Sequence, residues 1–238
     1  MALSLLEIVQ RVRGRLGQPI PTSVAGSSDP GIIQSLGLLN EFVEDLLMRK
    51  YWQSNIREGE FYAIAAENQG ALSTLFPDGF EGLLPDTLYN RTTQLQLRGG
   101  ISPEEWTAGQ ALNSSGPIPN FRIRGNSLLL SPVPVAGERY TCEYMSSYFV
   151  YGPSDATYRT YWLRDTDTCV VGDALPMAYL KWAWKKEKGL EYAEDFRKYE
   201  ALVAVKSLRE KRPQVLSMNG GPETFRPGIL VSPGSWPL

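Results

Sequence analysis

The spacing of apolar residues changes twice along this chain of 238 residues, and these changes constrain the fold more than any other feature. Over residues 1–51, apolar side chains recur every three or four positions, the period of helices that bury one face. Over residues 52–172, they alternate in short runs broken by Gly, Pro and Asn, which is typical of strands joined by turns. The helical period returns over residues 173–212. We therefore predict an α+β fold, in which the N- and C-terminal helices form a helical bundle with a β-rich insertion between them.

Two helices are predicted within residues 1–51. Ser4 and Glu7 stand at the spacing of a capping box, which predicts the start of the first helix. Asp29, which is followed by a proline, predicts the start of the second, and its apolar stripe runs to about Tyr51.

Two more helices are predicted within residues 173–212. Asp173 predicts the N-cap of the first of them, and Gly189 predicts its end. Trp182 and Trp184 stand two positions apart, so they point to opposite sides of that helix. We expect one indole to face the core and the other to be exposed, as at a surface that packs against a partner. The neighbouring lysines and glutamates are typical of a solvated face or of a salt-bridge surface between subunits.

The middle of the chain contains the strand signals. Residues 57–64 and 138–148 predict strands, and residues 92–98 alternate as a half-buried strand does. The clearest hairpin spans residues 120–130, because two alternating runs flank the turn dipeptide Gly125-Asn126. No repeat is visible.

Residues 213–238, called the C-terminal arm from here on, cannot build a core of their own. They contain five prolines and four glycines, and only Glu223 and Arg226 are charged. The arm nevertheless has large apolar side chains, which suits an extended segment lying on the surface of another protein. The alternative is an arm that folds back on its own domain. The apolar anchors that we expect are Phe225, Ile229, Leu230, Val231 and Trp236.

Composition removes most catalytic chemistries. The chain has no histidine, which excludes Ser/His/Asp and Cys/His triads. Its two cysteines, Cys142 and Cys169, provide neither a Cys-based zinc site nor a disulfide scaffold. The net charge is -2, without the basic excess of ordinary nucleic-acid binding. The first residues do not read as a signal peptide, and no run is long enough to span a membrane, so we expect synthesis in the cytoplasm.

The remaining candidates for chemistry are carboxylates. Asp165 and Asp167 stand at the spacing that starts a calcium loop, but the glycine and the closing glutamate of such a loop are missing. A polar turn is the competing interpretation. An enzyme that uses only carboxylates would draw on these two residues together with Glu104 and Glu105, and would respond to Mg²⁺ or Ca²⁺. We predict no catalytic site, no metal site and no cofactor.

Three stretches resemble one protein family: residues 38–47, 120–134 and, most extensively, 165–200. They are similar to the head-to-tail adaptor (connector) proteins of short-tailed bacteriophages. The resemblance implies a virion structural protein that forms a ring, usually of twelve copies, beneath the portal at one capsid vertex. Such a ring joins the portal to a tail nozzle or tail tube protein, and DNA passes through its channel during ejection. The β-rich insertion faces the tail, and a C-terminal arm extends along the portal.

The resemblance also implies roles for particular residues. The C-terminal arm is expected to bind the portal through its five apolar anchors, and the protein is expected at the head–tail junction of the virion, with no membrane partner. The alternatives are another tail or head-closure component of the virion, or the carboxylate-dependent enzyme described above. Contacts between subunits are expected at Trp182, Trp184, Lys185, Lys186 and Glu187.

Overall fold

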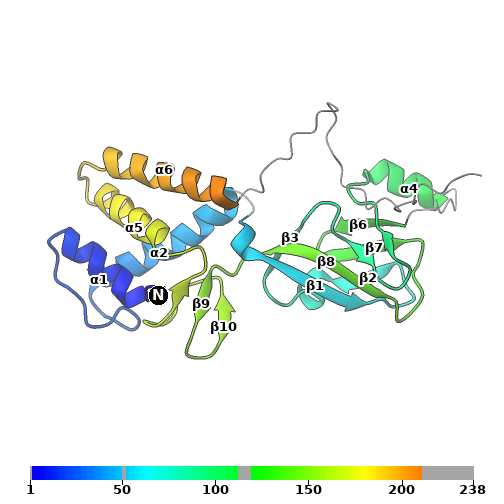
Figure 1. The fold of residues 1–238 in the computed structure, drawn as a ribbon, viewed down its shortest axis with the longest axis horizontal. Coiled ribbons are helices and arrows are strands. Elements are labelled where there is room, and N and C mark those ends of the chain that lie inside the picture. Colours follow the sequence, from blue (N-terminus) through cyan, green and yellow to red (C-terminus); the bar gives the residue numbers. More distant parts are fainter. Residues whose placement is uncertain (1, 50–51, 112–118, 211–238) are drawn as a thin grey trace, which may run out of the picture.

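The computed structural model describes residues 2–49, 52–111 and 119–210. Over these ranges the chain is a mixed α/β protein with six α-helices and several antiparallel sheets, which agrees with the predicted α+β class. Figure 1 shows α1, α2, α5 and α6 at one end of the molecule and the longest strands at the other. None of the described helices is both long and apolar enough to cross a membrane.

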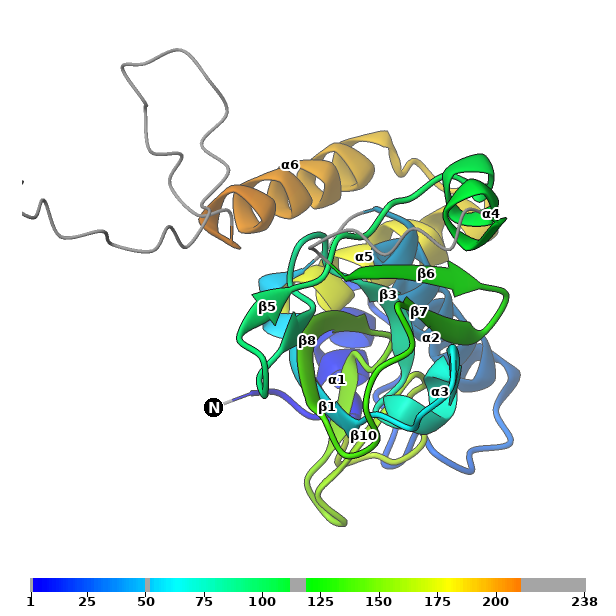
Figure 2. The ribbon, with the colours of Figure 1, turned by 90° about the vertical axis from the view of Figure 1, so that its right-hand side faces the viewer.

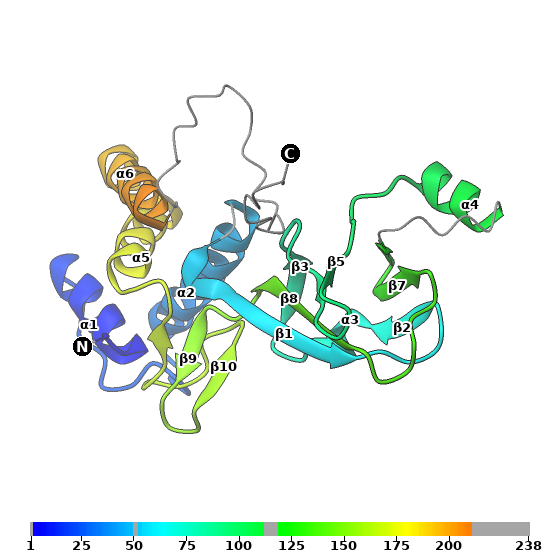
Figure 3. The ribbon, with the colours of Figure 1, turned by 45° about the vertical axis from the view of Figure 1, so that its right-hand side comes forward.

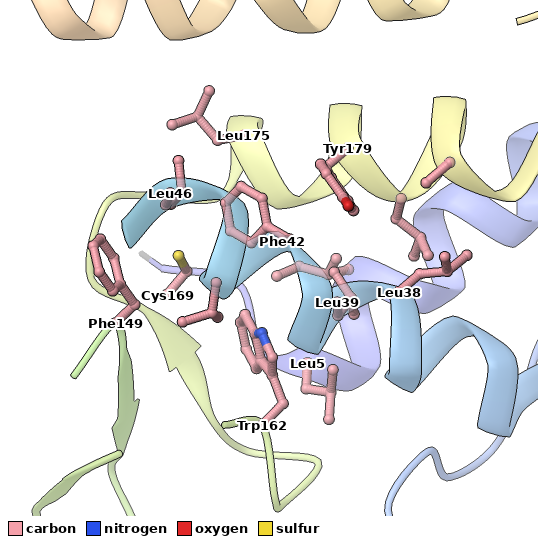
Figure 4. Packing of buried hydrophobic residues seen from close by; sticks show 14 of the residues in the cluster. Leu5, Leu38, Leu39, Phe42, Leu46, Phe149, Trp162, Cys169, Leu175 and Tyr179 are labelled. Carbon is pink, nitrogen blue, oxygen red and sulfur yellow. The ribbon is translucent and has the colours of Figure 1, made fainter. Parts of the chain in front are cut away.

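The helical end is organised around α5. Its helices are α1 (Leu5–Arg15), α2 (Pro30–Arg49), α5 (Ala174–Glu187) and α6 (Ala193–Glu210). α5 contacts each of the other three and lies between α6 and α1 in Figure 3. Their buried side chains form one cluster, called the helical core here, in which α2 and α5 interdigitate (Figure 4). Its fully buried members include Leu5, Leu39, Phe42, Leu46 and Tyr199.

The helix ends follow the predicted chemistry with one exception. The Ser4 hydroxyl accepts a hydrogen bond from the backbone N–H of Glu7, and the Glu7 carboxylate accepts one from the backbone of Ser4, so the capping box is confirmed. Gly189 ends α5 with a φ of 66°, as predicted. Asp173 occupies the predicted N-cap position of α5, but its side chain does not cap the helix. Asp173 already has helical backbone angles, which differ from the extended conformation of a capping residue, and its side chain makes no capping hydrogen bond.

The β-rich end contains two sheets. In the larger one, β1 (Ile56–Tyr62) pairs along its length with β8 (Arg139–Ser146). β8 also pairs with β3 (Phe80–Leu83) and β4 (Tyr89–Asn90), and β4 pairs with β5 (Leu95–Gln96). The smaller sheet has the order β2 (Asn68–Ala71), β7 (Ser127–Ser131), β6 (Asn120–Arg124). The helices α3 (Leu72–Leu75) and α4 (Pro103–Ala111) belong to the same end, as Figure 2 shows.

A second cluster of buried side chains holds these sheets together. Phe61 on β1 stacks on Tyr140 of β8 at 5.3 Å between ring centroids and meets Phe76 edge-on at 6.0 Å. Gly59 lets Phe76 approach the strand, because a Cβ atom at this position would lie 2.5 Å from that ring. This cluster shares no residue with the helical core, so the described part of the chain contains two separate cores.

The hairpin over residues 120–130 is confirmed as β6, a turn at Gly125-Asn126 and β7. The strand predicted over residues 92–98 is reduced to the two residues of β5. The cause is local: the side-chain carbonyl of Asn90 accepts hydrogen bonds from the backbone N–H groups of Thr92 and Thr93. This turn uses the donors that a longer strand would have offered to its neighbour.

A small sheet links the two ends. It consists of β10 (Thr157–Arg159), β9 (Val150–Gly152) and β11 (Thr168–Cys169). Buried side chains of this region, such as Phe149 and Trp162, belong to the helical core. The guanidinium of Arg57 on β1 lies 3.9 Å from the ring centroid of Tyr158 on β10, so β1 and this sheet are in direct contact.

Candidate interaction surface

A groove lies where α5 turns into α6. Trp182 of α5 meets Phe196 of α6 edge-on at 5.1 Å between ring centroids, and Tyr192 lies 6.5 Å away. The three rings line a hollow of about 540 Å³, and Lys186 and Arg197 stand at its rim. Tyr192 and Phe196 are 39% and 37% exposed, so their faces are open to a partner. We call this feature the aromatic groove.

The two tryptophans do not divide between core and solvent as predicted. Trp184 is 8% exposed and belongs to the helical core. Trp182 is half-buried, because its indole packs on the aromatic side chains of α6 and on Tyr179 at 5.0 Å. The expectation of one exposed indole is therefore wrong. The α6 helix, which folds back over α5, supplies the cover that the spacing of the tryptophans alone does not reveal.

The other predicted contact residues divide into two groups. Lys185 is engaged within the chain, since its ammonium and that of Lys181 each lie 2.6 Å from a carboxylate oxygen of Asp195. Lys186 and Glu187 are exposed. The Lys186 ammonium lies 5.9 Å from the Trp182 ring, which places a positive charge at the aromatic groove. Of the five predicted residues, Lys186 and Glu187 are exposed, Trp182 and Lys185 are half-buried, and Trp184 is buried.

Asp195 joins α5 to α6 beneath this surface. Burial raises the pKa of its carboxyl, but the hydrogen bonds and charges of Lys181 and Lys185 outweigh that effect and hold the pKa below its ordinary value. The charged form is therefore favoured in the folded state. Its contribution to stability is present above the ordinary carboxyl pKa of 3.8 and is lost as the pH falls through the lower folded pKa.

The variant Asp195→Asn is expected to lower the free energy of unfolding at pH 7 by about 1–3 kcal/mol, because it leaves two lysines without their charged partner. The difference from the native protein should start to shrink below pH 3.8 and disappear as the pH falls through the lowered pKa of the folded carboxyl, where that group is itself protonated. Urea denaturation at both pH values measures it. Glu194→Gln is the matched control, since Glu194 forms only an exposed pair with Lys198, and it should change stability little. A difference that persists unchanged at low pH would contradict this account.

The C-terminal half of α6 exposes large apolar side chains, and this was not predicted. The helical spacing of α6 predicts one buried apolar stripe of Tyr192, Phe196, Tyr199, Val203 and Leu208. Of these five, only Tyr199 and Val203 are buried. Leu202, Val205 and Leu208 are 39%, 46% and 66% exposed and follow one another at intervals of three. We call these three residues the α6 stripe. The signal was present in the sequence, since α6 carries apolar residues around more of its circumference than one buried face needs.

The carboxylates considered for catalysis have structural partners. Asp165 accepts hydrogen bonds from the backbone N–H groups of Val24 and Ala25, at 2.8 and 2.7 Å. Asp167 is fully buried and accepts backbone N–H groups at the start of its own turn. Within the described ranges, no three of the residue types His, Cys, Asp and Glu gather as metal ligands. The polar turn is therefore the interpretation that the geometry supports for this segment.

The two cysteines and the two glutamates at the start of α4 do not form a reactive site with one another. Burial raises the pKa of the Cys142 and Cys169 thiols to about 12, so both stay protonated at neutral pH. Glu104 and Glu105 lie in the exposed first turn of α4, and Glu105 approaches Arg98 at 3.9 Å. The five arm residues expected to bind a portal, Phe225, Ile229, Leu230, Val231 and Trp236, lie outside the described residues.

No protein-family model matches the sequence. No curated protein sequence matches it significantly either.

Proposed function

We propose that this protein is a virion structural protein of a short-tailed bacteriophage: an adaptor whose copies form a ring, of twelve by family resemblance, between the capsid portal and the tail. It acts without catalysis, and DNA passes through its channel without specific binding. The observation that carries the proposal is the α6 stripe, whose three large apolar side chains are exposed on the same helix as the aromatic groove. A chain in which Asp165 and Asp167 accept structural hydrogen bonds, and whose outermost helix exposes large apolar side chains, is suited to assembly.

In this proposal, the helical end, the β-rich end and the C-terminal arm each bind a different neighbour. α1, α2, α5 and α6 form the bundle that packs between neighbouring subunits, and α6 is the helix that faces outward. The β-rich end has a core of its own, so it can serve as a separate docking unit toward a tail nozzle or tail tube protein. The C-terminal arm follows directly after α6 and is proposed to bind the portal.

The charge balance supports the same role. A ring that lets DNA slide through must not hold phosphates, and a protein with a net charge of -2 offers them no basic surface overall. The basic residues of α6 are interspersed with acids: Lys198 pairs with Glu194 near the groove, and Lys206 pairs with Glu210 at the far end of the helix. They suit salt bridges between subunits better than a continuous track for DNA.

The variant Val205→Glu tests this proposal at the α6 stripe. Portal rings, made from the portal gene of the same genome, are mixed with native or variant protein and separated by size exclusion. The native protein should co-elute with the portal. The variant should stay free, because an apolar contact between subunits does not tolerate a buried, unpaired carboxylate. Its melting temperature should match that of the native protein, because Val205 is exposed.

Ile123→Glu is the matched control. It places the same charge at a comparably exposed apolar position on β6, far along the chain from α6. This control should still co-elute with the portal. Native protein that never co-elutes contradicts the proposal as a whole, and a Val205→Glu variant that binds like the native protein contradicts the assigned surface.

A further inference from the structure

We propose that the aromatic groove binds the C-terminal arm of the same chain, with the segment Pro222-Glu223-Thr224-Phe225 as its occupant. This docking stands independently of the adaptor proposal. The groove presents the faces of Tyr192 and Phe196 beside Trp182 in a hollow of about 540 Å³. Grooves lined by aromatic rings in this way recognise extended, proline-containing segments. The arm is such a segment.

The length of the chain selects the part of the arm that reaches the groove. The arm continues from the far end of α6, where the Glu210 carboxylate accepts the backbone N–H of Gln53 at 2.9 Å. Along α6, this end lies about 21 Å from Phe196 in the groove at the helical rise. Pro213 lies too few residues beyond Glu210 to span that distance. The twelve residues 211–222 span about 37 Å as an extended polyproline-type chain, so Pro222 is the first proline of the arm that can enter the groove.

An apolar path connects the two points. The α6 stripe, made of Leu202, Val205 and Leu208, is exposed along the helix between Glu210 and the groove. The part of the arm that must follow this path contains three large apolar residues of its own, Val215, Leu216 and Met218. Burying these against the stripe removes apolar surface on both sides from water, which favours the arm lying back along α6.

Charge fixes the position of the docked segment. Glu223 is the arm's only acidic residue, and it directly follows Pro222. The groove is rimmed by two cations, Lys186 and Arg197. With Pro222 and Phe225 against the rings, the carboxylate between them lies at this positive rim, and such charge pairing sets register more than it adds affinity.

The same chain is the favoured source of the segment because the connection is short. A short linker presents its segment at an effective concentration in the millimolar range. A second copy at micromolar concentration competes poorly with that. If the adaptor proposal also holds, the docked arm covers the α6 stripe and keeps unassembled chains from associating, and release of the arm frees both surfaces together.

Photo-crosslinking of the full-length protein tests this docking. Tyr192→p-benzoylphenylalanine places a photoreactive group in the groove, and the position is exposed enough to accept it. Irradiation at micromolar concentration should give a product of monomer mass in which residue 192 is joined to the arm near Phe225, as located by peptide mass spectrometry. A product only of dimer mass, or crosslinks that miss the arm, would overturn the proposal.

A pair of charge variants tests the register in the same experiment. Glu223→Lys should lower the crosslinking yield several-fold, because it brings a third cation to the rim. Arg226→Glu, which also reverses a charge of the arm, should keep or raise the yield. Equal losses in both variants would overturn the assigned segment. Portal binding is not part of this readout, so its outcome is separate from that of the adaptor proposal.

Discussion

Replacing Asp167 with alanine is expected to lower the free energy of unfolding by about 3–5 kcal/mol, the range for breaking a buried charged contact. The Asp167 side chain is fully buried. It accepts the backbone N–H groups of Leu163 and Arg164 at 2.9 and 2.8 Å, and the Arg159 guanidinium lies 3.2 Å away. Alanine leaves two backbone donors and one mostly buried cation without this acceptor, and water reaches the site poorly. Chemical denaturation measures the loss.

The same variant distinguishes two roles for Asp167, a structural hydrogen-bond acceptor and a metal ligand. We expect millimolar Ca²⁺ or Mg²⁺ to leave the melting temperature of the native protein unchanged, because a bound ion would raise it by mass action. Thr166→Ala is the control within the same turn, since the Thr166 hydroxyl contacts only the exposed Ser154 hydroxyl, and it should cost little. A metal-dependent rise in the melting temperature of the native protein that disappears in Asp167→Ala would contradict the polar turn and support a calcium loop at this segment.

Deleting residues 213–238 is expected to leave the fold intact and to abolish stable attachment to the portal. The described residues already form both cores, and the buried members of these cores lie within residues 5–203. In the proposed ring each copy contributes one arm, so later contacts become effectively intramolecular and the avidity gain is roughly 10²–10⁴-fold. Co-sedimentation with portal rings measures attachment, and the melting temperature reports on the fold.

A chain whose arm is replaced by a Gly/Ser segment of equal length is the matched control. It keeps the length but removes the apolar anchors, and it should fail to attach as the deletion does. Attachment by either variant at the native level would contradict the role of the arm. It would not bear on ring formation, which electron microscopy tests separately.

Helix ends and the hairpin were predictable because their causes are local. The capping box of Ser4 and Glu7 needs only residues three apart, and the turn at Gly125-Asn126 needs only its own dipeptide. Asp173 shows the limit of such reasoning. Its residue type is favourable for an N-cap, but its backbone already has helical angles. The sequence pattern does not predict this conformation.

Packing between distant segments was not predictable in the same way. Trp162 and Phe149 lie in a stretch with strand-like spacing, yet their side chains fill the helical core, where the backbone N–H of Trp162 is held by the side chain of Asn40. Such contacts depend on residues more than a hundred positions apart, and alternation within one segment carries no record of them.

The candidate surface was found in part. The sequence predicted Trp182 and Lys186 as contact residues, and both line the aromatic groove. It did not reveal Tyr192 and Phe196 as their partners, because the expected stripe of α6 assigned both rings to a buried face. The spacing of one helix shows which residues share a side, but not how deeply the neighbouring helix covers them.

Electron microscopy of the full-length protein mixed with portal rings tests the central claim most directly. The account predicts a second ring of this protein stacked coaxially beneath the portal, with its β-rich end pointing away. Bare portals at saturating protein concentration, observed with a correctly folded sample, would contradict the adaptor function.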